Sequence, residues 1–172
     1  MAFRIGLLAG AALLALAIPC AAQTRGAIVG KVGANIERAE DALSGESPAV
    51  GADLLFQLND RWDLDVEVWY PGYFTTDFGI RHRDILFTVG ARRLFGEGRI
   101  KPFVGFGLGV AVTQEKRDPP FDYDPGAGST YYFAGGVDIP LGTRFFLIPE
   151  LRLTLGSATG VVRPAIGVGV RF

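Results

Sequence analysis

The sequence has almost nothing that could cross-link the chain or bind a soft metal. Its 172 residues include one cysteine and one histidine. The cysteine, Cys20, lies within the first 22 residues, so the 150 residues that follow form no disulfide and no cysteine-based zinc site. Disulfide frameworks and zinc-ribbon modules are therefore excluded.

An excess of charge of one sign is also lacking. Lysine plus arginine number 17 and aspartate plus glutamate number 18, which gives a formal net charge of −1. A nucleic-acid-binding domain would carry a basic surface and a strong positive excess, so we expect no nucleic-acid partner. Glycine, by contrast, is abundant, because its 24 occurrences are about twice the usual share of roughly 7%.

Long apolar runs are missing everywhere except at the N-terminus. There Arg4 precedes the apolar stretch 5–18, and Pro19 is followed by the small residues Cys20, Ala21 and Ala22. This order is that of a secretory signal peptide, and the run is shorter than the roughly 20 residues of a membrane helix. We expect residues 1–22 to be cleaved off after Ala22. A lipoprotein signal is the alternative, but Ala17 and Pro19 fit its requirements before Cys20 poorly.

The rest of the chain alternates apolar and polar residues with a period of two, which predicts β-strands. Turn residues separate eight such segments. They are 26–37, 49–58, 62–70, 84–95, 100–113, 130–139, 144–156 and 161–172. The connections after the second, fourth and sixth are short, whereas those after the first, third and fifth are ten or more residues long. Short turns at one rim and longer loops at the other are typical of a bacterial membrane barrel.

The two faces of these strands differ in a way that decides the class. One face is almost purely aliphatic and aromatic, which suits lipid, and closure into a ring satisfies the backbone hydrogen bonds inside a bilayer. The other face carries glycines and the charged residues, which we expect to point into a narrow lumen and form a salt-bridge network. These lumen residues are Lys31, Asp53, Asp65, Glu67, Arg92, Asp138, Glu150, Arg152, Arg163 and Arg171. We expect glycines such as Gly105, Gly107, Gly109, Gly167 and Gly169 to make room for the long charged side chains.

Aromatic residues are expected at both membrane interfaces. Trp62, Phe95, Phe145 and Phe172 fall near the rim with the short turns, and Tyr70 and Tyr131 near the other rim.

With these features, residues 23–172 resemble the small eight-stranded outer-membrane barrels of Gram-negative bacteria, the group of OmpX and the OmpA transmembrane domain. The most specific feature is the C-terminal strand, in which Ile166, Val168 and Val170 precede a terminal Phe172. This pattern looks like the assembly signal that the barrel-assembly machinery reads in that family, although the strand has few aromatic residues. The resemblance implies an all-β, eight-stranded, antiparallel up-and-down transmembrane barrel in the outer membrane.

Evidence for catalysis is lacking in the sequence. Some outer-membrane barrels hydrolyse lipid A with a His-x-Ser arrangement, but the residue two positions after His82 is Asp84. The glycines at 105, 107 and 109 do not have the spacing of a dinucleotide-binding loop. We therefore expect no enzyme activity, cofactor or metal. The basic triplet Arg81, His82 and Arg83 is a candidate contact to lipopolysaccharide phosphates by charge attraction.

The sequence thus predicts a monomeric, non-enzymatic barrel with a structural or surface-interaction role through its external loops. Its expected partners are outer-membrane lipids, lipopolysaccharide, the assembly machinery and an external partner that the sequence does not identify. Two alternatives stay open at this point: a channel of the same fold for a small solute or an apolar ligand, and a soluble exported lipocalin-like binder.

Overall fold

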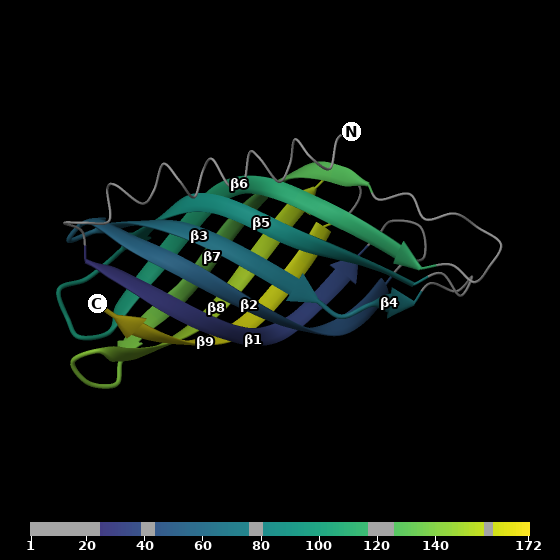
Figure 1. Ribbon diagram of the computed structural model, residues 1–172. Coiled ribbons are helices and arrows are strands. Elements are labelled where there is room, and N and C mark those ends of the chain that lie inside the picture. The colour runs from purple at the N-terminus through teal and green to yellow at the C-terminus, as the bar shows by residue number, and fades with distance from the viewer. Residues whose placement is uncertain (1–24, 39–43, 76–80, 117–125, 157–159) are drawn as a thin grey trace.

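The computed structural model describes residues 25–38, 44–75, 81–116, 126–156 and 160–172, and all regular structure among them is β-strand (Figure 1). The strands are β1 (Gly26–Arg38), β2 (Ser44–Asn59), β3 (Trp62–Pro71), β4 (Phe74–Thr75), β5 (Arg81–Leu94), β6 (Lys101–Lys116), β7 (Ala127–Pro140), β8 (Phe145–Gly156) and β9 (Gly160–Arg171). No helix among the described residues is long and apolar enough to cross a membrane. The expected signal peptide, residues 1–22, lies outside the described residues.

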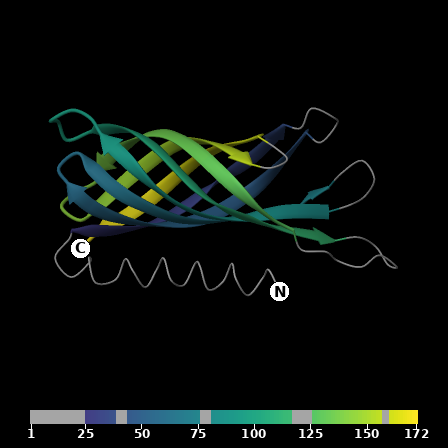
Figure 2. The ribbon, with the colours of Figure 1, turned by 90° about the horizontal axis from the view of Figure 1, so that it is seen from above.

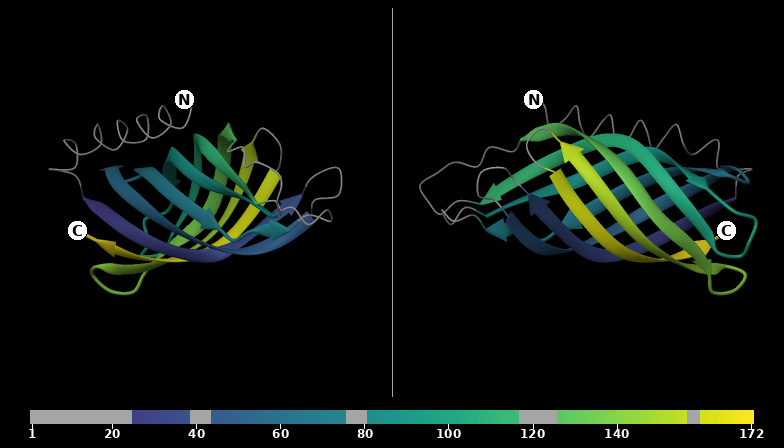
Figure 3. Two further views of the ribbon diagram at one scale, coloured as in Figure 1. Left: turned by 45° about the vertical axis from the view of Figure 1, so that its right-hand side comes forward. Right: turned by 180° about the vertical axis from the view of Figure 1, so that it is seen from behind.

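The strands close into one antiparallel ring. With the exception of β3 and β4, which do not pair with each other, each strand pairs with its neighbours in the sequence, and β1 also pairs with β9, so that the ring closes. The short strand β4 follows β3 after Gly72 and Tyr73, and both strands pair with β5. β3 and β4 therefore share one position in the ring, and the nine strands occupy eight positions, which we call staves. The expected eight-stranded antiparallel barrel is confirmed. Figure 2 and Figure 3 show the ring from further directions, with the strands crossing obliquely.

The short turns share a rim with the C-terminus (Figure 1). At this rim Asn59 Oδ1 accepts hydrogen bonds from the backbone N–H groups of Arg61 and Trp62, at 3.0 and 3.1 Å, which closes the β2–β3 turn. The backbone N–H of Phe172 donates to Gly26 at 2.9 Å, which ties the last residue to the first strand. We call this rim the near rim and the opposite one the far rim.

The strands extend further at the far rim than the sequence predicts. β2 begins at Ser44 where we expected residue 49, β5 begins at Arg81 where we expected 84, and β6 ends at Lys116 where we expected 113. The reason is that hairpin pairing continues past the apolar belt. In β1 and β2, Glu37 still pairs with Gly45 in backbone register. The alternation of apolar and polar residues, from which the strand ends were predicted, stops before the hydrogen bonding does.

The expected facing of the strands is confirmed along the whole ring. In β9 the outward residues Ile166 and Val168 are 54% and 52% exposed, whereas Arg163 on the inward face of the same strand is 2% exposed. In β3 the burial alternates residue by residue from Trp62 to Pro71. The outer surface is therefore a belt of aliphatic and aromatic side chains, and the charged residues lie inside.

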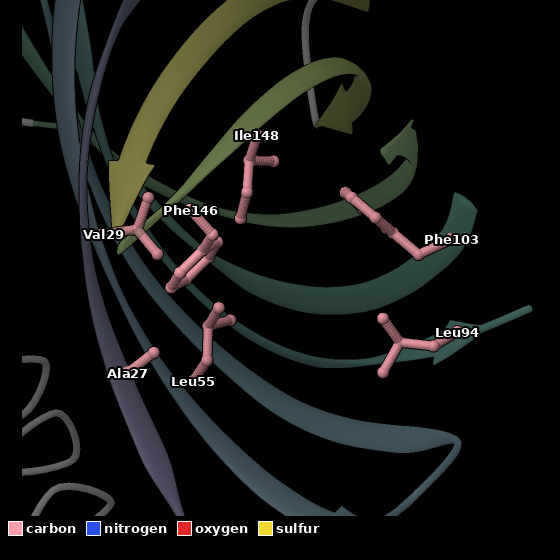
Figure 4. Close-up of a cluster of buried hydrophobic side chains, with 7 residues drawn as sticks. All are labelled: Ala27, Val29, Leu55, Leu94, Phe103, Phe146 and Ile148. Atoms are coloured by element: carbon pink, nitrogen blue, oxygen red, sulfur yellow. The ribbon is translucent and has the colours of Figure 1, made fainter. Parts of the chain in front are cut away.

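Among the described residues, side chains fill the interior in layers. Near the rim with the short turns, side chains from five strands pack together into an apolar plug (Figure 4). The plug consists of Ala27, Val29, Leu55, Leu94, Phe103, Phe146 and Ile148. A second apolar group contains Ala49, Trp69, Leu86, Ala111 and Ala165. Charged side chains occupy much of the remaining interior.

The lumen glycines make room mainly for aromatic rings, which corrects the expectation that they accommodate long charged side chains. A Cβ at Gly90 or Gly107 would collide with Tyr132, and one at Gly169 would collide with the ring of Phe146. Gly167 fits the expectation in part, since an added Cβ there would lie 2.7 Å from Val29 and 3.0 Å from Cγ of Lys31. A Cβ at Gly105 would lie in ordinary contact with Cβ of Arg92 at 3.5 Å, and one at Gly109 would collide with Thr88. Both rings lie beside a glycine of the neighbouring strand, since Tyr132 pairs with Gly107 and Phe146 pairs with Gly169 in backbone register.

Candidate functional site

The centre of the lumen is a salt-bridge network built around Glu67 on β3. Its carboxylate contacts the guanidinium of Arg152 at 2.8 Å, that of Arg163 at 3.1 Å and Nζ of Lys31 at 3.2 Å. Glu67 is 1% exposed. These four residues come from β3, β8, β9 and β1, so a single carboxylate links four staves of the barrel.

The cations of this network have further partners. Lys31 Nζ also lies 2.5 Å from Asp53 and 3.1 Å from Glu150. Arg152 contacts Asp65 at 2.9 Å and Glu150 at 2.8 Å. The central network thus combines three cationic and four anionic side chains. Its members are Lys31, Arg152, Arg163, Asp53, Asp65, Glu67 and Glu150.

A second, smaller network lies closer to the near rim. Arg92 contacts Asp63 at 2.8 Å and Asp138 at 3.8 Å, and Asp138 accepts a 2.6 Å contact from Arg171. Asp63 was missing from the expected network although it alternates in phase with Asp65. The alternation along β3 was sufficient to include it, and the structure pairs it with Arg92 on β5 in backbone register.

Aromatic rings support several of these cations. The guanidinium of Arg152 lies 4.1 Å from the ring centre of Tyr132, and that of Arg171 lies 4.3 Å from that of Phe146. Arg163 stacks on Trp69 at 5.1 Å, and Trp69 Nε1 in turn donates to Asn35 Oδ1 at 2.7 Å. All ten charged residues predicted for the lumen therefore face the interior, and the structure pairs each of them with an opposite charge.

The pairing leaves some buried polar atoms without a protein partner. In the part of the chain that the structure describes, these include Oδ1 of Asp53 and of Asp65, and Nε and Nη2 of Arg163. The same part holds no group of three or more histidine, cysteine, aspartate or glutamate side chains arranged to bind a metal ion. The arrangement resembles a structural network that cross-braces the staves, because every carboxylate in it faces a cation.

On its outward face, β5 carries arginines near both rims. At the near rim, Arg93 lies 5.7 Å from the ring centre of Trp62 and 5.4 Å from that of Phe95. The other aromatic residues expected at this rim also face outward, since Phe145 is 54% and Phe172 is 66% exposed. Their placement fits an aromatic girdle at a membrane interface.

At the far rim, Arg83 lies between two tyrosines. Its guanidinium is 4.4 Å from the ring centres of both Tyr70 and Tyr73, and its Nε and Nη2 donate to Gln114 Oε1 at 2.9 and 2.6 Å. Arg81 is exposed and lies 5.9 Å from the ring centre of Tyr73. Of the candidate triplet, Arg81 and Arg83 therefore share this rim. The side chain of His82 lies outside the described residues.

The arginines of β5 lie at opposite edges of the apolar belt, Arg83 at the far rim and Arg93 at the near rim. Arg83 and Arg93 are separated by ten residues of β5, or about 34 Å along a strand. At a tilt of about 40° this is about 25 Å along the barrel axis, the height of the lipid-facing band of outer-membrane barrels. Tyr73 and Gln114 were not foreseen, because Tyr73 follows the end of β3 and the pairing of Gln114 with Arg83 depends on the register of the β5–β6 hairpin.

The chain was compared with protein-family models, curated sequences and solved structures. No protein-family model and no curated protein sequence matches the chain. Among solved structures, Neisserial surface protein A is similar, with a TM-score of 0.68, 14% identity and coverage of 86% of this chain and 97% of that one. The chain has the fold of the small eight-stranded outer-membrane β-barrels.

Two other solved barrels of this kind are similar over almost their whole length. The attachment invasion locus protein Ail of Yersinia pestis, determined with the heparin analogue sucrose octasulfate, has a TM-score of 0.67 at 12% identity, covering 87% of this chain and 99% of that one. The N-terminal barrel domain of Pseudomonas aeruginosa OprF has a TM-score of 0.63 at 16% identity, covering 87% of this chain and 100% of that one. At this level of identity the similarity establishes the shared fold.

Proposed function

We propose that the chain is an integral outer-membrane barrel with a closed lumen, whose role is non-enzymatic and carried by the loops and side chains at its far rim. The observation that carries this proposal is the inversion of polarity: the belt of the barrel is apolar outside and charged inside. A soluble barrel of the lipocalin type would bury its apolar face and expose its charges, so the second alternative loses its support.

The exposed apolar belt supports a location in a membrane. Leu108 and Phe133 are 58% and 59% exposed at the middle of the belt, where water would make such exposure costly. Arginine and aromatic side chains bound the belt at both rims, as they do in membrane barrels. The similar structures are outer-membrane proteins, which favours that membrane over any other.

The filled lumen favours a structural barrel over a channel. The apolar plug spans the near end, with Val29 and Phe146 at 0% exposure. Beyond it, the central network ties four staves together through Glu67. Charged residues inside a conducting pore would be hydrated and mobile, whereas Arg152 here is 1% exposed and held by three carboxylates.

The proposal also assigns the C-terminal strand a role in assembly of the barrel in the membrane. Ile166, Val168 and Val170 lie on the outward face of β9, and the exposed Phe172 follows its end. A recognition signal for the assembly machinery would be accessible there before the barrel closes against β1. We further propose that the mature chain acts as a monomer, since one chain closes the ring. The signal peptide ending at Ala22 would be removed during export.

Planar-bilayer recording of the refolded chain tests the closed lumen. We expect vesicle insertion without a reproducible single-channel conductance. Arg152→Ala, which removes the cation from the middle of the network, provides the sensitised variant. A steady conductance in the wild type that changes in Arg152→Ala would replace the structural barrel with the channel alternative.

A further inference from the structure

We propose that Arg83 and Arg81, with Tyr70, Tyr73 and Gln114, form a binding site for the phosphate of a lipid headgroup in the outer leaflet. The inference rests on the proposed membrane location and assigns it a specific ligand chemistry. We refer to these five residues as the far-rim cluster.

The first argument is the geometry of the Arg83 guanidinium. Two tyrosine rings lie 4.4 Å from it, and Gln114 Oε1 accepts from both Nε and Nη2. Side chains from β3, from β6 and from the residue before β4 therefore fix one cation on β5. Because a guanidinium has five N–H donors, the two contacts to Gln114 leave most of the donor set for another acceptor. A planar, pre-oriented donor fork is the arrangement that binds phosphate oxygens bidentately.

The second argument is charge. The outward face of the strands carries very few charged side chains among those described: Glu46 on β2 and the three arginines Arg81, Arg83 and Arg93 on β5. Arg81 and Arg83 are two residues apart on one strand and so point to the same side of the sheet. The cluster is thus a pair of cations next to an apolar belt, and its occupant is an anion with an apolar body.

The third argument is position. Arg83 lies at the far edge of the belt, and its two rings continue the belt, since Tyr70 is 43% exposed and follows Val68 at 41% on the same face of β3. A soluble phosphate would gain only the cationic contact. A phosphorylated lipid would gain the same contact while its acyl chains cover the exposed side chains beneath it. The geometry therefore favours a lipid over a free anion.

Arg93 supplies the matched control. It lies on the same strand, faces the same side and stacks on two rings, Trp62 and Phe95, but at the opposite rim. A general effect of interfacial arginines on membrane anchoring would appear equally in both variants. Recognition of an outer-leaflet headgroup would appear only at Arg83.

The experiment measures lipid binding to the refolded full barrel in zwitterionic micelles by native mass spectrometry and thermophoresis. The probes are bisphosphoryl lipid A, the same lipid with its phosphates removed, and inorganic phosphate. We expect Arg83→Gln to weaken lipid A binding about tenfold or more, as loss of charge-assisted hydrogen bonds predicts. Arg83→Lys should restore part of the affinity, and Arg93→Gln should leave it unchanged.

Three results would overturn the proposal: unchanged affinity in Arg83→Gln, an equal loss in Arg93→Gln, or equal binding of the dephosphorylated lipid. Competition by inorganic phosphate at the same concentration as lipid A would make the site a free-anion site. If Arg83→Gln fails to fold, as judged by heat-modifiable gel mobility, the exposed Arg81→Gln serves instead, with a smaller expected loss. Vesicle insertion of the wild type, measured in parallel, separates failure of this proposal from failure of the membrane location.

Discussion

Replacing Glu67 by glutamine is the sharpest perturbation of the lumen, because one carboxylate holds three cations. Glu67→Gln keeps the shape of the side chain and removes its charge. Lys31 keeps its contacts with Asp53 and Glu150, and Arg152 keeps those with Asp65 and Glu150. Arg163, which is 2% exposed, loses the charge of its ion-pair partner at 3.1 Å. The loss in the free energy of unfolding therefore arises mainly from the buried guanidinium of Arg163.

The size of the effect follows from burial. Removing one partner of a buried ion pair costs about 3–5 kcal/mol, and we expect the lower part of this range because the amide oxygen still accepts a hydrogen bond. The measurement is urea unfolding in phosphatidylcholine vesicles, followed by tryptophan fluorescence. Glu46→Gln is the control, since it removes the same charge from an exposed position on β2 and should change stability by no more than about 0.5 kcal/mol.

A double-mutant cycle assigns the cost to Arg163. Combining Glu67→Gln with Arg163→Gln should cost less than the sum of the two single changes, by about 1–3 kcal/mol. A penalty below about 1 kcal/mol for Glu67→Gln would refute the reasoning, because that is the value of a solvated surface pair. Such a result would mean that water fills the lumen, which favours the channel alternative.

Three further outcomes are expected. Val66→Arg, which places a cation on the lipid-facing side of β3 next to Glu67, should cost about 2–4 kcal/mol in vesicles, and a cost equal to that of Val66→Gln would contradict the assigned facing. Gly107→Val introduces branched carbon atoms against the Tyr132 ring and should lower the urea midpoint of unfolding. The control Gly98→Val, in the near-rim turn, should leave the midpoint unchanged, and equal midpoints for the two variants would show that Tyr132 has room to move. Deleting Phe172, which is 66% exposed, should leave refolding in detergent intact and reduce the outer-membrane fraction in cells; unaffected assembly would remove the proposed signal.

The sequence predicts the architecture well because the decisive information is local. Alternation along a single strand assigns each side chain to a face, and this is why Val66 and Glu67 are placed correctly without knowledge of any partner. Turn residues such as Asn59 mark the near rim in the same way, since the Asn59 side chain caps its own turn. These signals need only neighbouring residues.

Partner choice across the lumen is not local, and the sequence does not reveal it. Glu67 and Arg163 are 96 residues apart, and their contact depends on how far the strands are staggered around the whole ring. The contacts of Arg83 also depend on strand register, since Tyr73 lies beyond the end of β3 and Gln114 lies opposite Arg83 only in the register that the β5–β6 hairpin adopts. The glycines illustrate the limit most clearly: the alternation already places Tyr132 and Phe146 inside the barrel, but only the structure shows that their rings lie against Gly107 and Gly169.

Folding of the purified chain with and without an amphiphile tests the membrane barrel itself most directly. Circular dichroism and heat-modifiable gel mobility should show a β-rich, compact form in detergent or vesicles, and an aggregated or unfolded chain in plain buffer. A monomeric, β-rich protein that stays soluble in buffer without detergent would contradict the account, because the exposed apolar belt would then have to be covered in some other way.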